Sequence, residues 1–130
     1  MPARKPINLR EHILNVNDRV PEEMEIKEWG VTVYLRPLSA EERTKVVDYA
    51  SKMRKKGDMT GVELQTFMMK LVVMGLCDAE GGRLFTEDDA AALATKHAGV
   101  LERIGVRIAN MAGLNPEMRE ELRDRFREQQ

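Results

Sequence analysis

The segment from Thr60 to Gly75 constrains the fold of this chain most strongly, because as a helix it would be apolar on nearly every side. Thr60 and Glu63 stand three residues apart, the spacing of a capping box, which predicts that a helix begins there. The apolar residues that follow are Leu64, Phe67, Met68, Leu71, Val72, Met74 and Gly75. A helix with so little polar surface belongs in the centre of a domain. The sequence therefore predicts a fold packed around residues 60–75.

Size and composition predict a single soluble domain spanning residues 1–130. The chain has 130 residues, within the usual domain size of roughly 100–200 residues. Apolar residues make up 42% and charged residues 33%, which suits a globular protein with a charged exterior. The longest apolar stretch, Phe67 to Leu76, contains Lys70 and is about half a membrane span, so no membrane association is expected. A single cysteine, Cys77, excludes an intramolecular disulfide and fits a reducing cytosol.

Residues 20–36 have the pattern of a β-hairpin. Met24 and Ile26 alternate with charged residues, as in a half-buried strand. Gly30 supplies the backbone freedom that a turn needs. In the second strand three apolar residues face one way: Val31, Val33 and Leu35. Pro37 cannot donate to a sheet ladder, so we expect it to end that strand.

Residues 39–113 are predicted to form the helical core. Ser39 with Glu42 and Thr86 with Asp89 are further capping boxes, which predict helices starting at each. The periodicity continues to about residue 112, with a kink or break near His97–Gly99. Gly113 is a suitable C-terminal cap. Together with the hairpin, this gives a mainly α fold with a small β-hairpin (α+β), in which four to six helices form a bundle after two antiparallel strands.

The two ends of the chain differ from this core. Residues 1–8 read as a flexible arm with two prolines, and a short helical stripe follows it at Leu9, Ile13, Leu14 and Val16. Residues 115–130 open with Asn-Pro, which caps and starts a helix well. Their apolar residues are spaced four apart among charged ones: Met118, Leu122 and Phe126. Such a narrow stripe is typical of a helix that docks on a neighbour, or of a solvated tail.

No residue pattern in the chain indicates catalysis, a cofactor or a metal. His12 and His97 lie in separate segments without a partner pattern, and the acidic residues after Cys77 would raise the pKa of its thiol. The segment 78–89 resembles a calcium loop only superficially, since position 6 would be Arg83 and position 12 Asp89. A glycine turn followed by a helix cap explains it better. We therefore expect a protein that is not an enzyme.

Charge argues against a nucleic-acid partner. The net charge is −1, so no overall field attracts a polyanion. The basic cluster comprises Lys52, Arg54, Lys55 and Lys56, and it falls at the predicted end of a helix, where cations favour the helix dipole. A small helical DNA-binding or regulatory protein of phage origin remains an alternative. It would need a basic recognition surface.

Two segments, taken together and in order, resemble the tail assembly chaperones of long-tailed, non-contractile bacteriophages. The first is a Glu-rich strand ending in Trp29-Gly30, followed by a Val-rich strand and Leu38-Ser-Ala-Glu-Glu-Arg43. The second runs Gly75-Leu-Cys-Asp-Ala-Glu-Gly-Gly-Arg-Leu-Phe-Thr-Glu-Asp-Asp89 and is the more specific. The resemblance covers roughly residues 9–128.

This resemblance implies a non-enzymatic function in tail morphogenesis. Such chaperones are thought to bind and solubilise the tape measure protein and to promote tail tube polymerisation around it. The implied partners are the tape measure protein, the tail tube protein through a longer frameshifted form, and further copies of the same chain. The implied location is the host bacterial cytoplasm, with no copy left in the mature virion. A minor structural tail protein is the remaining alternative.

Two kinds of surface are predicted to carry these contacts. An isolated hairpin has a free edge, so Val31, Val33 and Leu35 are predicted to pair or pack against another copy. Methionine-rich surfaces adapt to helical partners. The predicted partner-binding residues are therefore Met68, Met69, Met74, Met118, Leu122 and Phe126, although core packing is the more usual role for most of the methionines in residues 60–75.

Overall fold

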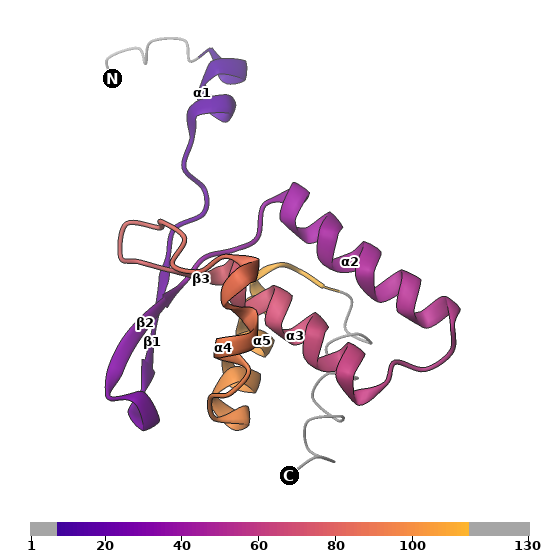
Figure 1. Ribbon diagram of the computed structural model, residues 1–130. Helices are drawn as coiled ribbons and strands as arrows, with labels where there is room; N and C mark the ends of the chain where they lie inside the picture. The colour runs from indigo at the N-terminus through magenta and orange to yellow at the C-terminus, as the bar shows by residue number, and fades with distance from the viewer. Residues whose placement is uncertain (1–7, 115–130) are drawn as a thin grey trace.

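The computed structural model describes residues 8–114, which form an α+β fold (Figure 1). The strands are β1 (Glu22–Ile26), β2 (Val31–Leu35) and β3 (Leu76–Cys77). The helices are α1 (Leu9–Asn15), α2 (Ala40–Lys55), α3 (Gly61–Gly75), α4 (Ala90–Leu93) and α5 (Ala98–Met111). Two short 3-10 turns, η1 (Lys27–Trp29) and η2 (Glu87–Asp89), complete the order. The predicted fold class, a hairpin followed by helices, is confirmed.

The hairpin forms where the alternation placed it and gains a third strand. β1 and β2 are antiparallel, with Met24 opposite Val33, and Gly30 turns the chain with φ of 65°. β3 then pairs with the end of β2, Leu76 opposite Leu35. The sheet order is therefore β1-β2-β3. Two residues are too few to show a strand period, so β3 could not be predicted from the residue pattern.

Helix α3 occupies the centre, as its apolar sequence predicted. It begins at the predicted capping box, where Glu63 N donates to Thr60 Oγ1 at 3.1 Å. Its buried residues are Leu64, Phe67, Met68, Met69, Leu71, Val72, Val73, Met74 and Gly75. They belong to one hydrophobic cluster that extends from Ile26 in the sheet to Leu114. Helices α2 and α5 both pack on α3.

Two acidic side chains of the hairpin, Glu22 of β1 and Glu28 of η1, pair with arginines of α5. Arg107 Nη2 lies 3.1 Å from Glu22 Oε2, and Arg103 pairs with Glu28 in the hairpin turn. The hydrogen bond from Arg103 is the main cause that lowers the pKa of Glu28. These exposed pairs add little stability individually, and both link the hairpin to α5.

The third predicted helix is shorter than expected. Only the turn η2 and the four residues of α4 are helical, although Thr86 N does donate to Asp89 Oδ2 at 2.9 Å as the capping pattern required. The predicted interruption near His97 is a break. His97 caps α5 itself, because its Nδ1 accepts from Gly99 N at 3.1 Å.

The predictions for the two ends are tested only in part. The predicted arm falls outside the described residues apart from Asn8, and the predicted C-terminal helix, residues 115–130, falls outside them entirely. The stripe at Met118, Leu122 and Phe126 therefore stays a prediction. Gly113 has φ of 65°, which confirms the predicted C-terminal cap of the preceding helix.

A glycine permits the close packing of α3 on α5. A Cβ built on Gly75 would collide with the Ile108 side chain, where Cγ2 lies 2.9 Å away. We expect Gly75→Ala to lower the free energy of unfolding by about 1–3 kcal/mol through overpacking. This opposes the helix propensity of alanine, which exceeds that of glycine by about 1 kcal/mol. Urea denaturation measures the difference.

Gly105→Ala is the matched comparison, because a Cβ there meets Met68. Met68 is 1% exposed, and its mid-chain Sδ, not its free methyl end, lies nearest to the added Cβ, so the flexibility of methionine does not relieve the overlap. We therefore expect Gly105→Ala to lower the free energy of unfolding at least as much as Gly75→Ala. A Gly75→Ala protein as stable as the wild type would contradict this account of the α3–α5 contact.

Candidate interaction surfaces

The sheet edge is not where the sequence placed it. β2 lies between β1 and β3, and residue 35 already pairs with Leu76. Leu35 is also completely buried, so it belongs to the core. Val31 remains half exposed and Val33 partly buried, beyond the reach of β3. Of the predicted self-association edge, Val31 and Val33 thus lie outside the β2–β3 pairing, and the outer strands of this sheet are β1 and the two-residue β3.

The methionines of α3 are mainly core residues. Met68 and Met74 are 1% and 4% exposed and belong to the hydrophobic cluster, so packing accounts for their positions. Met69 is also buried, but it lines a hollow at the surface. Met69 can therefore be reached from outside, although packing also accounts for its burial.

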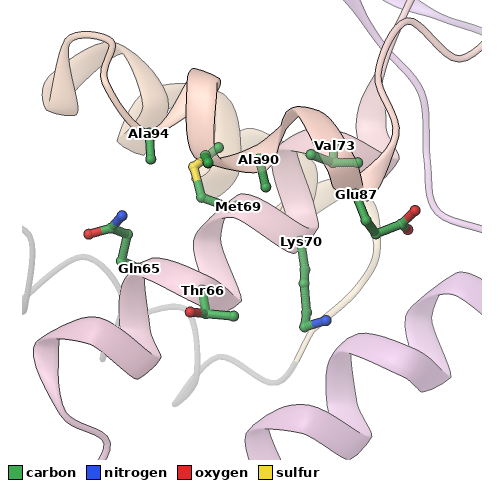
Figure 2. A pocket seen from close by; sticks show the side chains of 9 residues that line it. Gln65, Thr66, Met69, Lys70, Val73, Glu87, Ala90 and Ala94 are labelled. Atoms are coloured by element: carbon green, nitrogen blue, oxygen red, sulfur yellow. The ribbon is translucent and has the colours of Figure 1, made fainter.

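This hollow, which we call the α3–α4 groove, has a volume of about 340 Å³ (Figure 2). Its α3 side is formed by Gln65, Thr66, Met69, Lys70 and Val73, and its other side by Glu87, Ala90, Ala91 and Ala94. Figure 2 shows Met69 between the two helical segments, close to Ala90 and Ala94. The alanines leave the space open because their side chains are too short to fill it. Most of the lining is therefore apolar, with charge at its rim.

The two charged residues of the α3–α4 groove are held by neighbours. Lys70 Nζ lies 5.2 Å from the centre of the Tyr49 ring on α2, a cation–π contact. Glu87 Oε1 lies 3.0 Å from Arg83 Nη2. The hydrogen bond from Arg83 is the main cause that lowers the pKa of Glu87. Glu87 therefore keeps its negative charge to lower pH than a free glutamate.

A second hollow, which we call the Trp29–Phe85 hollow, lies between the hairpin turn and α4. It has a volume of about 570 Å³ and is lined by Trp29, Phe85, Asp89, Ala92, Leu93, Thr95 and Lys96. Trp29 belongs to the first of the two sequence segments that resemble the family, and Phe85 belongs to the second. Large, partly exposed aromatic side chains are the residues that most often anchor protein–protein contacts.

Glu42 joins three segments of the chain. Its carboxylate accepts from Ser39 N at 3.0 Å in the predicted capping box, and from Arg36 Nη2 at 3.2 Å. Arg19 Nη2 lies 3.0 Å from the same carboxylate, as an ion pair rather than a well-aligned hydrogen bond. Arg36 also donates to Gly81 O at 3.1 Å. The segment before β1 and the 78–82 turn are thus both tied to the start of α2.

The turn after β3 confirms the interpretation of the second motif. Asp78 Oδ1 accepts from Glu80 N at 2.9 Å and from Gly82 N at 2.8 Å, and Gly81 has φ of 90°. The carboxylate is thus used to hold the turn. No cluster of three potential metal ligands exists within residues 8–114. None of the helices in that range has the length and apolar character needed to cross a membrane.

Comparison with known proteins agrees with this architecture. The chain matches the family described as phage tail assembly chaperone over residues 8–122. It is also similar to the solved structure of the bacteriophage HK97 tail assembly chaperone, with a TM-score of 0.56 and 18% sequence identity. That alignment covers 79% of this chain and 91% of the HK97 chain. No curated protein sequence matches.

The structural likeness defines the fold class, which is the α+β architecture shared with the HK97 chaperone. The family match spans most of the 130 residues. The chain therefore belongs to the phage tail assembly chaperone family, and the resemblance found in the two sequence motifs is confirmed.

Cys77 offers a direct check on the described core. It is 1% exposed, and burial is the main cause that raises the pKa of its thiol. Because the thiolate is the reactive form, we expect native protein to react with a disulfide reagent such as Ellman's reagent far more slowly than protein unfolded in guanidinium chloride. Equal rates in the two states would contradict the burial of β3.

Proposed function

We propose that this protein is a non-enzymatic chaperone that binds the tape measure protein and keeps it soluble while tail tube subunits polymerise around it. The observation that carries the proposal is the family match over residues 8–122. A long helical protein with exposed apolar stripes aggregates unless those stripes are covered. A small partner with apolar hollows on its surface can cover them.

The Trp29–Phe85 hollow is the surface that we assign to the tape measure protein. It offers an apolar floor from Leu93 with aromatic sides, and Asp89 and Lys96 at its border carry opposite charges. An amphipathic helix places apolar residues into such a groove and its charged residues at the rim. The chemistry of the hollow therefore suits one stripe of a helical partner.

The proposal also covers the other binding partners of this protein and its location in the cell. Several copies of this chain act on one tape measure protein, and a longer frameshifted form recruits the tail tube protein. The work takes place in the host bacterial cytoplasm, and the chaperone is absent from the mature virion. Mass spectrometry of purified particles separates this function from that of a minor structural tail protein, which would be found in them.

Co-expression with the tape measure gene of the same locus tests the proposal. We expect the tape measure protein to be insoluble when expressed alone and to co-purify with several copies of this chain when both are made. Pull-down followed by light scattering gives the stoichiometry. A tape measure protein that remains insoluble in the presence of this chain would contradict the chaperone function.

A substitution in the Trp29–Phe85 hollow tests whether this surface binds the tape measure protein. Ala92 is exposed and lines the Trp29–Phe85 hollow, so Ala92→Arg fills it with a charged side chain without disturbing the core. We expect recovery of the tape measure protein to fall by tenfold or more, about 1.4 kcal/mol of binding free energy. Ala40→Arg, at an exposed alanine that begins α2, is the matched control and should leave recovery unchanged. Equal recovery with both variants would reject this surface.

A further inference from the structure

The Trp29–Phe85 hollow has one wall on the hairpin turn and another on the α4 side. Trp29 belongs to η1 in the turn, and the residues across from it include Ala92, Leu93, Thr95 and Lys96. The two walls come from parts of the chain that are far apart in sequence. The shape of the hollow therefore depends on how the hairpin turn is held relative to α4.

The sheet supports the hairpin only at the end away from this turn. β3 pairs with Tyr34 and Leu35 of β2, which lie opposite Glu23 and Glu22 at the start of β1. Figure 1 shows the hairpin turn at the far end of the two strands from β3. A two-stranded hairpin is only marginally stable by itself. The turn that carries Trp29 therefore depends on contacts with the helices.

The α4 side of the hollow is joined to α5 by the chain itself. Only His97 separates Lys96 from Ala98, the first residue of α5. His97 also caps α5, because its Nδ1 accepts from Gly99 N at 3.1 Å. This wall of the hollow is therefore held at the start of α5.

The turn side reaches the same helix through an ion pair. Arg103 of α5 donates through Nη2 to Glu28 Oε2, and Glu28 directly precedes Trp29 in η1. Arg107 lies one helical turn further along α5 and pairs with Glu22 at the start of β1. The two arginines thus reach both ends of β1, and Arg103 is the one that reaches the turn.

The geometry of η1 couples the directions of Glu28 and Trp29. A 3-10 helix has about three residues per turn, so consecutive side chains point about 120° apart. While Glu28 points toward Arg103, Trp29 points to a different side, where it lines the hollow. Ile26 is completely buried and anchors the end of β1, but it lies before η1 and does not set the rotation of the turn.

We propose that Arg103 is a positioning residue for the Trp29–Phe85 hollow: by holding Glu28, it orients the turn so that the Trp29 side chain forms the wall opposite α4. The inference rests on the proposed function of this hollow and gives a role to a helix outside its lining. Both partners of the pair are partly exposed, so salt screens their attraction. The wall is therefore held more firmly at low ionic strength than at high ionic strength.

Trp29 is the single tryptophan of the chain, so its fluorescence reports on the turn without a label. Arg103→Gln removes the ion pair. Arg107→Gln is the matched control, because the two arginines are 46% and 47% exposed on the same helix and each pairs with a hairpin glutamate. We expect Arg103→Gln to raise the acrylamide quenching constant of Trp29 by about twofold, as the loss of one exposed pair allows. Arg107→Gln should keep the wild-type value, and both variants should keep the wild-type circular dichroism.

Reversal of the charges separates positioning from the mere loss of an arginine. Glu28→Arg together with Arg103→Glu restores a pair of opposite sign, so we expect wild-type quenching of Trp29. At ~1 M NaCl the Debye length is about 3 Å, and the wild type should then approach Arg103→Gln. Wild-type quenching in Arg103→Gln, or no rescue by the reversed pair, would overturn the positioning role.

Pull-down of the co-expressed tape measure protein tests the consequence for binding. We expect Arg103→Gln to lower its recovery by about threefold, while Arg107→Gln and the reversed pair stay near the wild type. If Ala92→Arg abolishes recovery but Arg103→Gln does not change it, the hollow binds without control by Arg103, which overturns the inference. If Ala92→Arg also has no effect, the assignment of the hollow fails, and the quenching result alone decides whether Arg103 positions Trp29.

Discussion

The burial of α3 from Phe67 to Gly75, where Lys70 alone is partly exposed, is the constraint on which the rest of the structure depends. Each fully buried leucine, phenylalanine or methionine contributes roughly 1.5–3 kcal/mol, and α3 contains nine buried residues. No single neighbour can cover a helix that is apolar all round. The sheet, α2 and α5 must therefore all pack against it, and Gly75 and Gly105 let α5 come close enough to do so.

A second constraint is electrostatic and is centred on Glu42. One carboxylate caps α2, holds Arg36 and receives Arg19. These side chains are only partly exposed, at 16–29%, so the ion pairs are less screened than pairs in open water. Removal of Glu42 would leave two guanidinium groups without a counter-ion, which costs more than the net worth of the pairs. The cluster thus ties the segment before β1 to the start of α2.

The surfaces of functional interest are the two hollows that side-chain packing leaves open between neighbouring elements. The alanines of α4 face α3 across the α3–α4 groove, and the hairpin turn faces α4 across the Trp29–Phe85 hollow. Both hollows share α4, a helix of only four residues. For a member of the tail assembly chaperone family, the features of interest are which apolar surfaces stay open and where their charges are placed.

The sequence by itself determined the elements with local causes. The capping boxes at Ser39 and Thr60, the turn at Gly30 and the central position of α3 follow from neighbouring residues. Only the tertiary structure decided what depends on contacts between distant residues. Leu35 has no free edge because β3 pairs with it, and Met68 and Met74 lie in the core because neighbouring elements cover α3 there. A groove or an exposed face leaves no repeating residue pattern in the sequence, because it depends on which distant elements pack together.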